Sequence, residues 1–176
     1  MKIDVLKIIG SICILFGCSA VGFCLVDQMR KRLQELLFLR KQLAFIEGEI
    51  RHGLRNLPEI MFSMEQRCTG EWKVFFHRVA EKMYEEKNAP LTEIWKDTMR
   101  EVLQVSRLTV KQKREWEELG ENLGYLDCEM QLVLLQICQE HFQDFIREEQ
   151  EKYKKHARLY QTMGVMSGIF LVVIFI

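Results

Sequence analysis

Uncharged hydrophobic residues are concentrated at the two ends of the chain. Residues 8–26 form a run of nineteen residues without a charge, and residues 159–176 form a run of eighteen. As α-helices rising about 1.5 Å per residue, these runs would extend about 28 Å and about 27 Å, close to the ~30 Å hydrocarbon core of a bilayer. A lone segment can satisfy its backbone in hydrocarbon only as a helix. We therefore predict transmembrane helices at residues 4–27 and 159–176.

A cleavable segment is the alternative to the first span. A secretory signal has a shorter apolar core and a small-residue exit, and the run has neither. The stretch from Leu15 to Cys18 loosely resembles a lipoprotein cleavage site, but Phe16 suits that site poorly. An uncleaved membrane helix is the better interpretation.

Lys and Arg residues beside the two runs predict their direction. Lys2 and Lys7 precede the first run, whereas five basic residues follow it and four precede the second. Because basic residues favour the cytoplasmic side of a membrane, we expect residues 28–158 in the cytoplasm and both termini outside it. The nine basic residues are Arg30, Lys31, Arg32, Arg40, Lys41, Lys152, Lys154, Lys155 and Arg158.

Between the two runs, apolar residues recur every three or four positions, as they do in amphipathic helices. Gly, Pro and capping residues divide this pattern into six helices, of which the first continues from the first span to about His52. The sixth begins near Asp127 and continues into the second span. We predict an all-α fold, a six-helix antiparallel cytoplasmic bundle (28–158) flanked by N- and C-terminal transmembrane helices.

The periodic apolar residues define an expected core for the bundle. They are Met29, Leu33, Leu36, Leu39, Leu43, Ile46 and Ile50, widened by Leu37, Phe38 and Phe45; Ile60, Met61, Met64 and Cys68; Trp72, Phe75, Phe76, Val79, Ala80 and Met83; Leu91, Ile94, Trp95, Thr98 and Val102; Trp116, Leu119 and Leu123; and Met130, Leu134, Ile137, Phe142, Phe145 and Ile146.

Helix boundaries have their own signals. Thr109 and Gln112 fit a capping box, and Asn56 and Asp127 are expected caps. Gly120 lies inside a helix, where it costs about 1 kcal/mol relative to Ala. We interpret it as a point of close approach by another helix, and Gly124 as the end of its own helix.

Composition excludes several functional classes. Two of the 25 basic and two of the 25 acidic residues lie in 1–27 and none after 158, so the predicted bundle has 23 of each. A neutral domain is a poor match for nucleic acid. The sequence has no C-x-x-C or H-E-x-x-H spacing and no phosphate-loop or nucleophile motif, so we predict no metal, cofactor or catalytic residue. The cysteines and the four histidines, His52, His77, His141 and His156, are interpreted as structural or solvated.

Two weaker patterns leave alternatives open. Glu115, Glu118 and Glu121 would lie on one outward face, which is either a solvated surface or a docking patch for a basic partner. Small residues four apart, Cys18 with Gly22 and Gly164 with Gly168, could let the membrane helices pack closely. The spacing alone decides neither question.

Several strings extend the interpretation to a family. FIEGEIRHGLRNLPE (45–59), LGENLGYLDCEMQ (119–131) and KKHARLYQTMGVMSG (154–168), in this order and length, resemble the stage III sporulation protein AB family of endospore-forming bacteria. His52 and Asn56 depart from the family pattern, within a loop. The most specific matching residues are Glu47, Glu49, Ile50, Leu57, Pro58 and Glu59, and then Leu119, Gly120, Leu123, Gly124, Asp127 and Gln131.

The resemblance implies more than the spacing does. The family is similar to the platform subunit, or F domain, of type II secretion and type IV pilus machines, and it is not enzymatic. Its members act in the mother cell, in a channel to the forespore, and the expected partners are a cytoplasmic ATPase and other membrane subunits. Homo-oligomerisation is left open. The alternative function is a membrane-anchored regulator that binds a signalling protein, and the lack of polar groups in either span disfavours a membrane enzyme.

Overall fold

The computed structural model describes residues 2–52, 56–86, 89–104, 106–124 and 127–175, although inside the terminal helices it leaves out the side chains of 2–16, 18 and 19 and of most positions from 158 onwards. This described part of the chain contains helices and no strand. The helices are α1 (Lys2–His52), α2 (Leu57–Arg67), α3 (Gly70–Glu85), α4 (Leu91–Val102), α5 (Val110–Leu123) and α6 (Cys128–Phe175). The all-α prediction is confirmed, with long first and last helices as expected.

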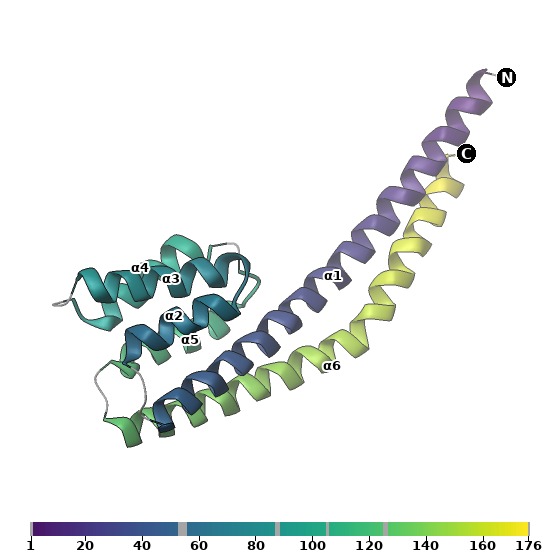
Figure 1. Ribbon diagram of the computed structural model, residues 1–176. Helices are drawn as coiled ribbons and strands as arrows, with labels where there is room; N and C mark the ends of the chain where they lie inside the picture. The colour runs from purple at the N-terminus through teal and green to yellow at the C-terminus, as the bar shows by residue number, and fades with distance from the viewer. Residues whose placement is uncertain (1, 53–55, 87–88, 105, 125–126, 176) are drawn as a thin grey trace. The chain divides into compact units, whose positions relative to one another are not determined.

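The chain divides into two compact units, 35–145 and the pair 1–34 with 146–176. The first of these is the helical bundle. In it, α2 to α5 follow one another as short helices, and the second half of α1 lies beside the beginning of α6 (Figure 1). Hydrogen bonds from Gln136 and Gln139 of α6 to Glu47 of α1 join these two antiparallel segments.

Aromatic side chains fill the centre of the bundle. Trp95 and Trp116 are fully buried, and their ring centroids lie 5.6 Å apart. The ring centroid of Trp116 also lies 5.5 Å from that of Trp72 on α3 and 6.1 Å from that of Phe142 on α6. Trp116 therefore contacts aromatic rings from three other helices. These edge-on and tilted contacts suit the quadrupoles of aromatic rings. The predicted aromatic core is confirmed.

The predicted helix ends are partly confirmed. Thr109 and Gln112 form both hydrogen bonds of the capping box. Asn56 occupies the cap position of α2, but its side chain accepts no capping hydrogen bond. Gly70 begins α3 with a φ of 62°, in the left-handed region that favours glycine.

The expected core of α6 needs a correction. Met130 and Ile137 are 55% and 47% exposed and Leu134 is half-buried, although all three were predicted to be buried. The buried face consists instead of Leu135, Cys138, Phe142, Phe145 and Ile146. Between 130 and 138 the residues of α6 are apolar on nearly every side of the helix. The spacing of apolar residues therefore could not show which side faces the core. Met83 and Val102 are half-buried as well. On α1, Met29, Leu33, Phe38 and Phe45 are half-buried and Leu37 is 43% exposed.

The second unit contains the first half of α1 and the last part of α6. Within it, the buried Glu149 carboxylate lies 3.7 Å from Arg32 and 3.3 Å from Lys152. Lys152 also lies 3.8 Å from Glu148, as the four-residue spacing predicts. Since burying a charge without a partner is costly, Arg32 and Lys152 stabilise Glu149 in this position.

The structure gives the helical backbone of the predicted membrane segments but leaves out most of their side chains. Over the part of the chain whose placement is described, no helix has a stretch long and apolar enough to cross a bilayer. The side chains at most positions of 4–27 and 159–176, including Cys18, Gly164 and Gly168, lie outside that part. Gly22 is buried, and a Cβ added at Gly17 would meet nothing within 4 Å.

Candidate partner-binding face on helices α5 and α6

Two glycines of α5 allow α4 to approach closely. A Cβ atom added at Gly120 would lie 2.2 Å from Cγ of Trp95, and one added at Gly124 would lie 2.9 Å from Cβ of Leu91. Both distances are shorter than van der Waals contact. Gly124 ends α5 with a φ of −85°, so the space it leaves, rather than a left-handed backbone, explains the glycine. The predicted close approach at Gly120 is confirmed, with Trp95 as the neighbour.

The corner between α5 and α6 is held by two polar side chains. Asp127 Oδ1 accepts a hydrogen bond from the backbone N–H of Met130 at 3.0 Å, as expected for the cap of α6. Gln131 Nε2 donates to the carbonyl oxygen of Leu123 at 2.6 Å. That carbonyl belongs to the last turn of α5, where backbone acceptors lack helical partners. The glycines therefore let α4 pack against α5, Gln131 joins α6 to α5, and Asp127 caps α6.

Glu47 has a similar structural role on α1. Its carboxylate accepts hydrogen bonds from Gln139 at 2.7 Å and Gln136 at 3.2 Å, and it also pairs with Arg51. The hydrogen bond from Gln139, followed by those from Gln136 and Arg51, holds the pKa of Glu47 below its ordinary value. The nearby carbonyl oxygen of Ile50 lies 3.6 Å from Sγ of Cys128. Of the other residues singled out in the sequence, Glu49, Leu57 and Pro58 are half-buried.

Glu35 is a structural residue that the sequence did not reveal. Its carboxylate accepts hydrogen bonds from Trp72 Nε1 at 3.1 Å, Ser106 Oγ at 2.7 Å and the backbone N–H of Arg107 at 3.0 Å. One side chain thus joins α1 to α3 and to the segment before α5. In the sequence, Glu35 is one acidic residue among many on a polar helix face, and no spacing distinguishes it.

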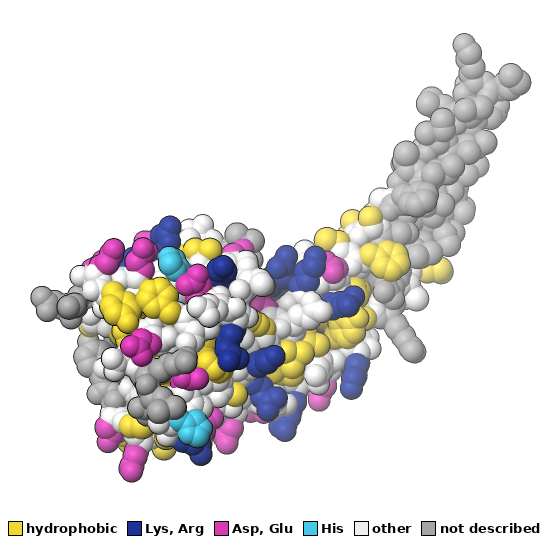
Figure 2. Space-filling view, in the orientation of Figure 1, with side chains coloured by type: hydrophobic (Ala, Val, Ile, Leu, Met, Phe, Trp, Pro, Cys, Tyr) yellow, Lys and Arg dark blue, Asp and Glu magenta, His cyan; other side chains and the backbone are white. Residues whose placement is uncertain are grey.

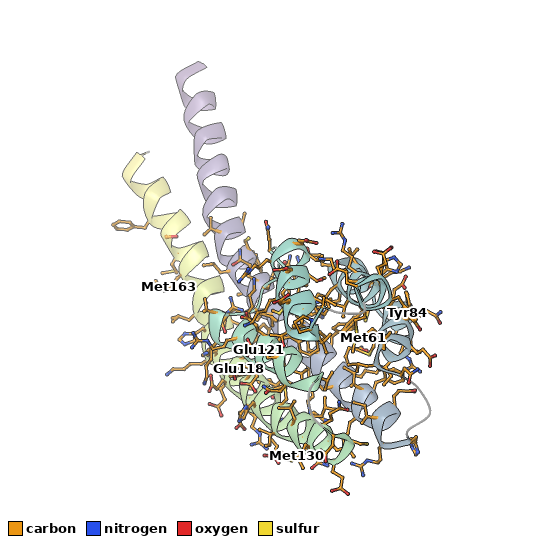
Figure 3. The ribbon with its side chains drawn as sticks, turned by 90° about the vertical axis from the view of Figure 1, so that its left-hand side faces the viewer. Met61, Tyr84, Glu118, Glu121, Met130 and Met163 are labelled. Carbon is orange, nitrogen blue, oxygen red and sulfur yellow. The ribbon has the colours of Figure 1, made fainter. Side chains whose placement is uncertain are left out.

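The three glutamates of the predicted docking patch have different neighbours. Glu121 forms an ion pair with Lys96 of α4. Glu115 Oε1 lies 2.7 Å from Nδ1 of His141 on α6. Glu118 is exposed, and Figure 3 labels it with Glu121 on α5. Glu121 therefore faces α4 and Glu115 faces α6, and Glu118 lies exposed between them on α5.

Helices α5 and α6 run antiparallel, with Glu115 beside His141 and Leu123 beside Gln131. Cys138 lies between these two contacts and is buried. Burial raises the pKa of the Cys138 thiol well above its ordinary value, and the carboxylates of Glu115 and Glu118 raise it further. Burial likewise raises the pKa of Cys68 to about 11. These thiols are therefore held in the neutral, unreactive form.

The described side chains form a pocket between α4 and α5 but no cluster of potential metal ligands. Within the part of the chain that the structure describes, no three His, Cys, Asp or Glu side chains gather around a common point where a metal ion could bind. A shallow pocket of about 260 Å³ lies between α4 and α5, and its lining includes Lys96, Arg100 and Lys113. Lys113 Nζ donates to the carbonyl oxygen of Leu103 at 3.0 Å, and Lys96 is paired with Glu121. These contacts stabilise the α4–α5 pair.

Comparison with known proteins identifies the family of the chain. Residues 7–176 match the family described as stage III sporulation protein AB (spore_III_AB). The chain belongs to this family. It is 18% identical over 169 residues to the stage III sporulation protein AB of Bacillus subtilis (strain 168), a match that covers 96% of this chain and 98% of that protein. No solved structure matches the chain significantly.

Proposed function

We propose that this chain is a non-enzymatic membrane platform subunit of a channel between mother cell and forespore during sporulation. Its helical bundle would face the mother-cell cytoplasm and engage an ATPase there. The observation that carries this proposal is the match of nearly the whole chain, residues 7–176, to the sporulation family. Family membership supports a role in sporulation. The platform role, the channel and the ATPase partner go beyond it and are what we propose.

The sequence supports anchoring at both ends. The uncharged runs at 8–26 and 159–176 have the length of a bilayer core, and basic residues cluster on their inner flanks. The proposal therefore places residues 4–27 and 159–176 in the membrane and both termini outside the cytoplasm. A reporter active only in the cytoplasm, fused at Ile176, should be silent. Activity of that fusion would contradict this topology.

The bundle supports a role through its surface rather than through chemistry. Glu47, Gly120, Asp127 and Gln131, which stand out in the sequence, serve in helix packing and capping. Charged side chains of both signs are mixed over the visible face of α2 to α4 (Figure 2).

Co-purification tests the proposal. The tagged full-length chain, extracted from sporulating cells in a non-ionic detergent, should bring down an ATPase with a phosphate-binding loop and further membrane subunits. The matched control is an unrelated tagged protein with two membrane helices, extracted in the same way. Capture of a signalling protein without an ATPase would favour the alternative function, a membrane-anchored regulator. Catalytic turnover by the purified chain of a small molecule that co-purifies with it would contradict a non-enzymatic role.

A further inference from the structure

An apolar stripe on α6 is exposed within the bundle. Met130, Val133 and Ile137 are 55%, 52% and 47% exposed. At three- and four-residue steps they lie on one side of the helix and extend over about 10 Å, or two turns. Met130 marks the end of this stripe near the corner with α5 (Figure 3). Isolated exposed apolar residues are ordinary, whereas adjoining ones on a single helix face make that face a candidate contact surface.

The charged residues that neighbour this stripe along the chain are acidic, and the cation of α1 on its Gln136 side, Arg51, is paired with Glu47. From Glu115 to Ile146 the sequence contains eight acidic residues and no Lys or Arg, although the whole chain has 25 of each sign. Two of the eight, Glu117 and Glu121, lie on the α4 side of α5, where they line the pocket or pair with Lys96. The remaining acidic residues are Glu115, Glu118, Asp127, Glu129, Glu140 and Asp144.

Acidic residues border the stripe on both sides. His141 lies about 40° around α6 from Ile137, and its contact with Glu115 shows that α5 is on that side. Glu140 lies about 60° from Ile137 in the opposite sense. Glu118 on α5 and Glu140 on α6 are both exposed. The stripe is therefore an apolar band bordered by Glu118 on one side and Glu140 on the other.

From this arrangement we propose that the stripe and its borders bind a basic amphipathic helix of a partner protein. Apolar residues of that helix would pack on Met130, Val133 and Ile137, and its Lys or Arg residues would meet Glu118 and Glu140. A helix fits because the exposed residues repeat at helical spacing over two turns. The charge complementarity requires a basic partner and disfavours a second copy of this face, which would bring like charges together. This inference rests on the proposed function only in taking the cytoplasmic ATPase as the source of the helix.

A designed peptide tests the chemistry of the surface directly. The probe is a labelled Leu/Lys amphipathic helix of about 18 residues, or five turns, added to the full-length chain in a non-ionic detergent. Its Leu/Glu counterpart is the control peptide. We expect the Leu/Lys peptide to bind, with an affinity that falls as salt is raised, and the Leu/Glu peptide not to bind. Equal binding of both peptides would overturn the proposal.

Matched variants locate the binding. The double reversal Glu118→Lys/Glu140→Lys should weaken binding at least about tenfold, as should Ile137→Gln. The control reversal is Glu81→Lys/Glu85→Lys on α3, and the apolar control is Val74→Gln, whose parent side chain is 45% exposed. Helical circular dichroism should be the same in all four variants. Equal losses in the controls, or a dimer of the chain that Ile137→Gln dissociates, would overturn the proposal.

Capture of the ATPase separates this inference from the proposed function. An ATPase captured undiminished by the double reversal would overturn the inference and leave the platform function in place. Binding of the Leu/Lys peptide to this face without any captured ATPase would contradict the platform function and support the surface. Loss of both peptide and ATPase in the double reversal, with retention in the α3 reversal, would support both.

Discussion

The two sides of helix α5 are built in opposite ways. On the side towards α4, Gly120 and Gly124 leave room for Trp95 and Leu91, Trp95 Nε1 donates to the carbonyl oxygen of Trp116, and Glu121 pairs with Lys96. On the side towards α6, Glu115 faces a histidine, Glu118 is exposed, and apolar residues of α6 beside them remain uncovered.

The difference shows which glutamates of one acidic helix serve the fold and which belong to a surface. Where α5 meets α4, side chains of α4 fill the space beside the glycines, and Lys96 of α4 neutralises the charge of Glu121. Where it meets α6, the contacts at Leu123 and Glu115 join the helices, and the outer edge is left acidic and apolar. The predictions below test this contrast, beginning with the largest expected effect.

Adding a methyl group at Gly120 should damage the α4 side severely. Because the new Cβ would overlap the Trp95 ring, we expect Gly120→Ala to lower the free energy of unfolding by about 3 kcal/mol, the upper part of the range for an overpacked core. The control is Gly48→Ala in α1, where a Cβ would meet nothing within 4 Å and should stabilise by about 0.5–1 kcal/mol. Denaturant unfolding of the full chain in detergent measures both. Equal effects would mean that Trp95 moves aside.

Removing the cap of α6 should have a smaller effect. Asp127→Ala loses the hydrogen bond to the Met130 N–H and should lower the free energy of unfolding by about 1 kcal/mol. Asn56→Ala is the matched control, because Asn56 occupies the cap position of α2 without a capping hydrogen bond. If both substitutions cost the same, the Asp127 hydrogen bond contributes nothing of its own.

The carboxylate that joins α1 to α6 should give a pH dependence. The pKa of Glu47 is lower in the folded chain than its ordinary value of 4.5, so its charge stabilises the fold above that pH. This contribution is lost as the pH falls below 4.5 and through the folded pKa. Glu47→Gln should therefore lower stability by about 0.5 kcal/mol at neutral pH and flatten its decline in acid. Parallel curves for both proteins in a pH series of unfolding measurements would contradict this.

Reversing one charge on each side of α5 should give the smallest and most direct contrast. Glu121→Lys places a second cation beside Lys96 and should lower the melting temperature, less so at about 1 M salt, where exposed charges are screened. Glu118→Lys should leave the melting temperature nearly unchanged, because Glu118 is exposed. The opposite ranking of the two variants would show that Glu118, and not Glu121, serves the fold.

Much of the fold could be predicted from the sequence because its signals are local. Hydrophobic period, the Thr109–Gln112 capping box and the Asp127 cap specify where helices lie and how they begin. Gly120 was predictable as a close approach, since a glycine inside a helix needs a reason. Trp95 as the approaching side chain was not predictable, because the residue that fills the space comes from another helix.

The surface was harder to predict, because exposure depends on which helices pack together. The sequence indicated an acidic face on α5 but grouped Glu121 with Glu115 and Glu118, although Lys96 pairs with Glu121. It assigned Met130 and Ile137 to the core, since nothing in a nearly continuous apolar stretch shows which side remains uncovered. Glu35 gave no signal at all, because its three donors come from distant parts of the chain.

The aromatic centre of the bundle has a spectroscopic consequence. The chain has three tryptophans, Trp72, Trp95 and Trp116, and all of them are buried in that centre. The ring centroid of Trp116 lies 5.5 Å from that of Trp72 and 5.6 Å from that of Trp95. Indoles held this closely and rigidly should couple their transitions, giving strong near-ultraviolet circular dichroism and a blue-shifted emission. Tryptophan fluorescence therefore reports on the folding of residues 35–145. Unfolding confined to the terminal parts of α1 and α6 should leave the wavelength of the emission maximum unchanged.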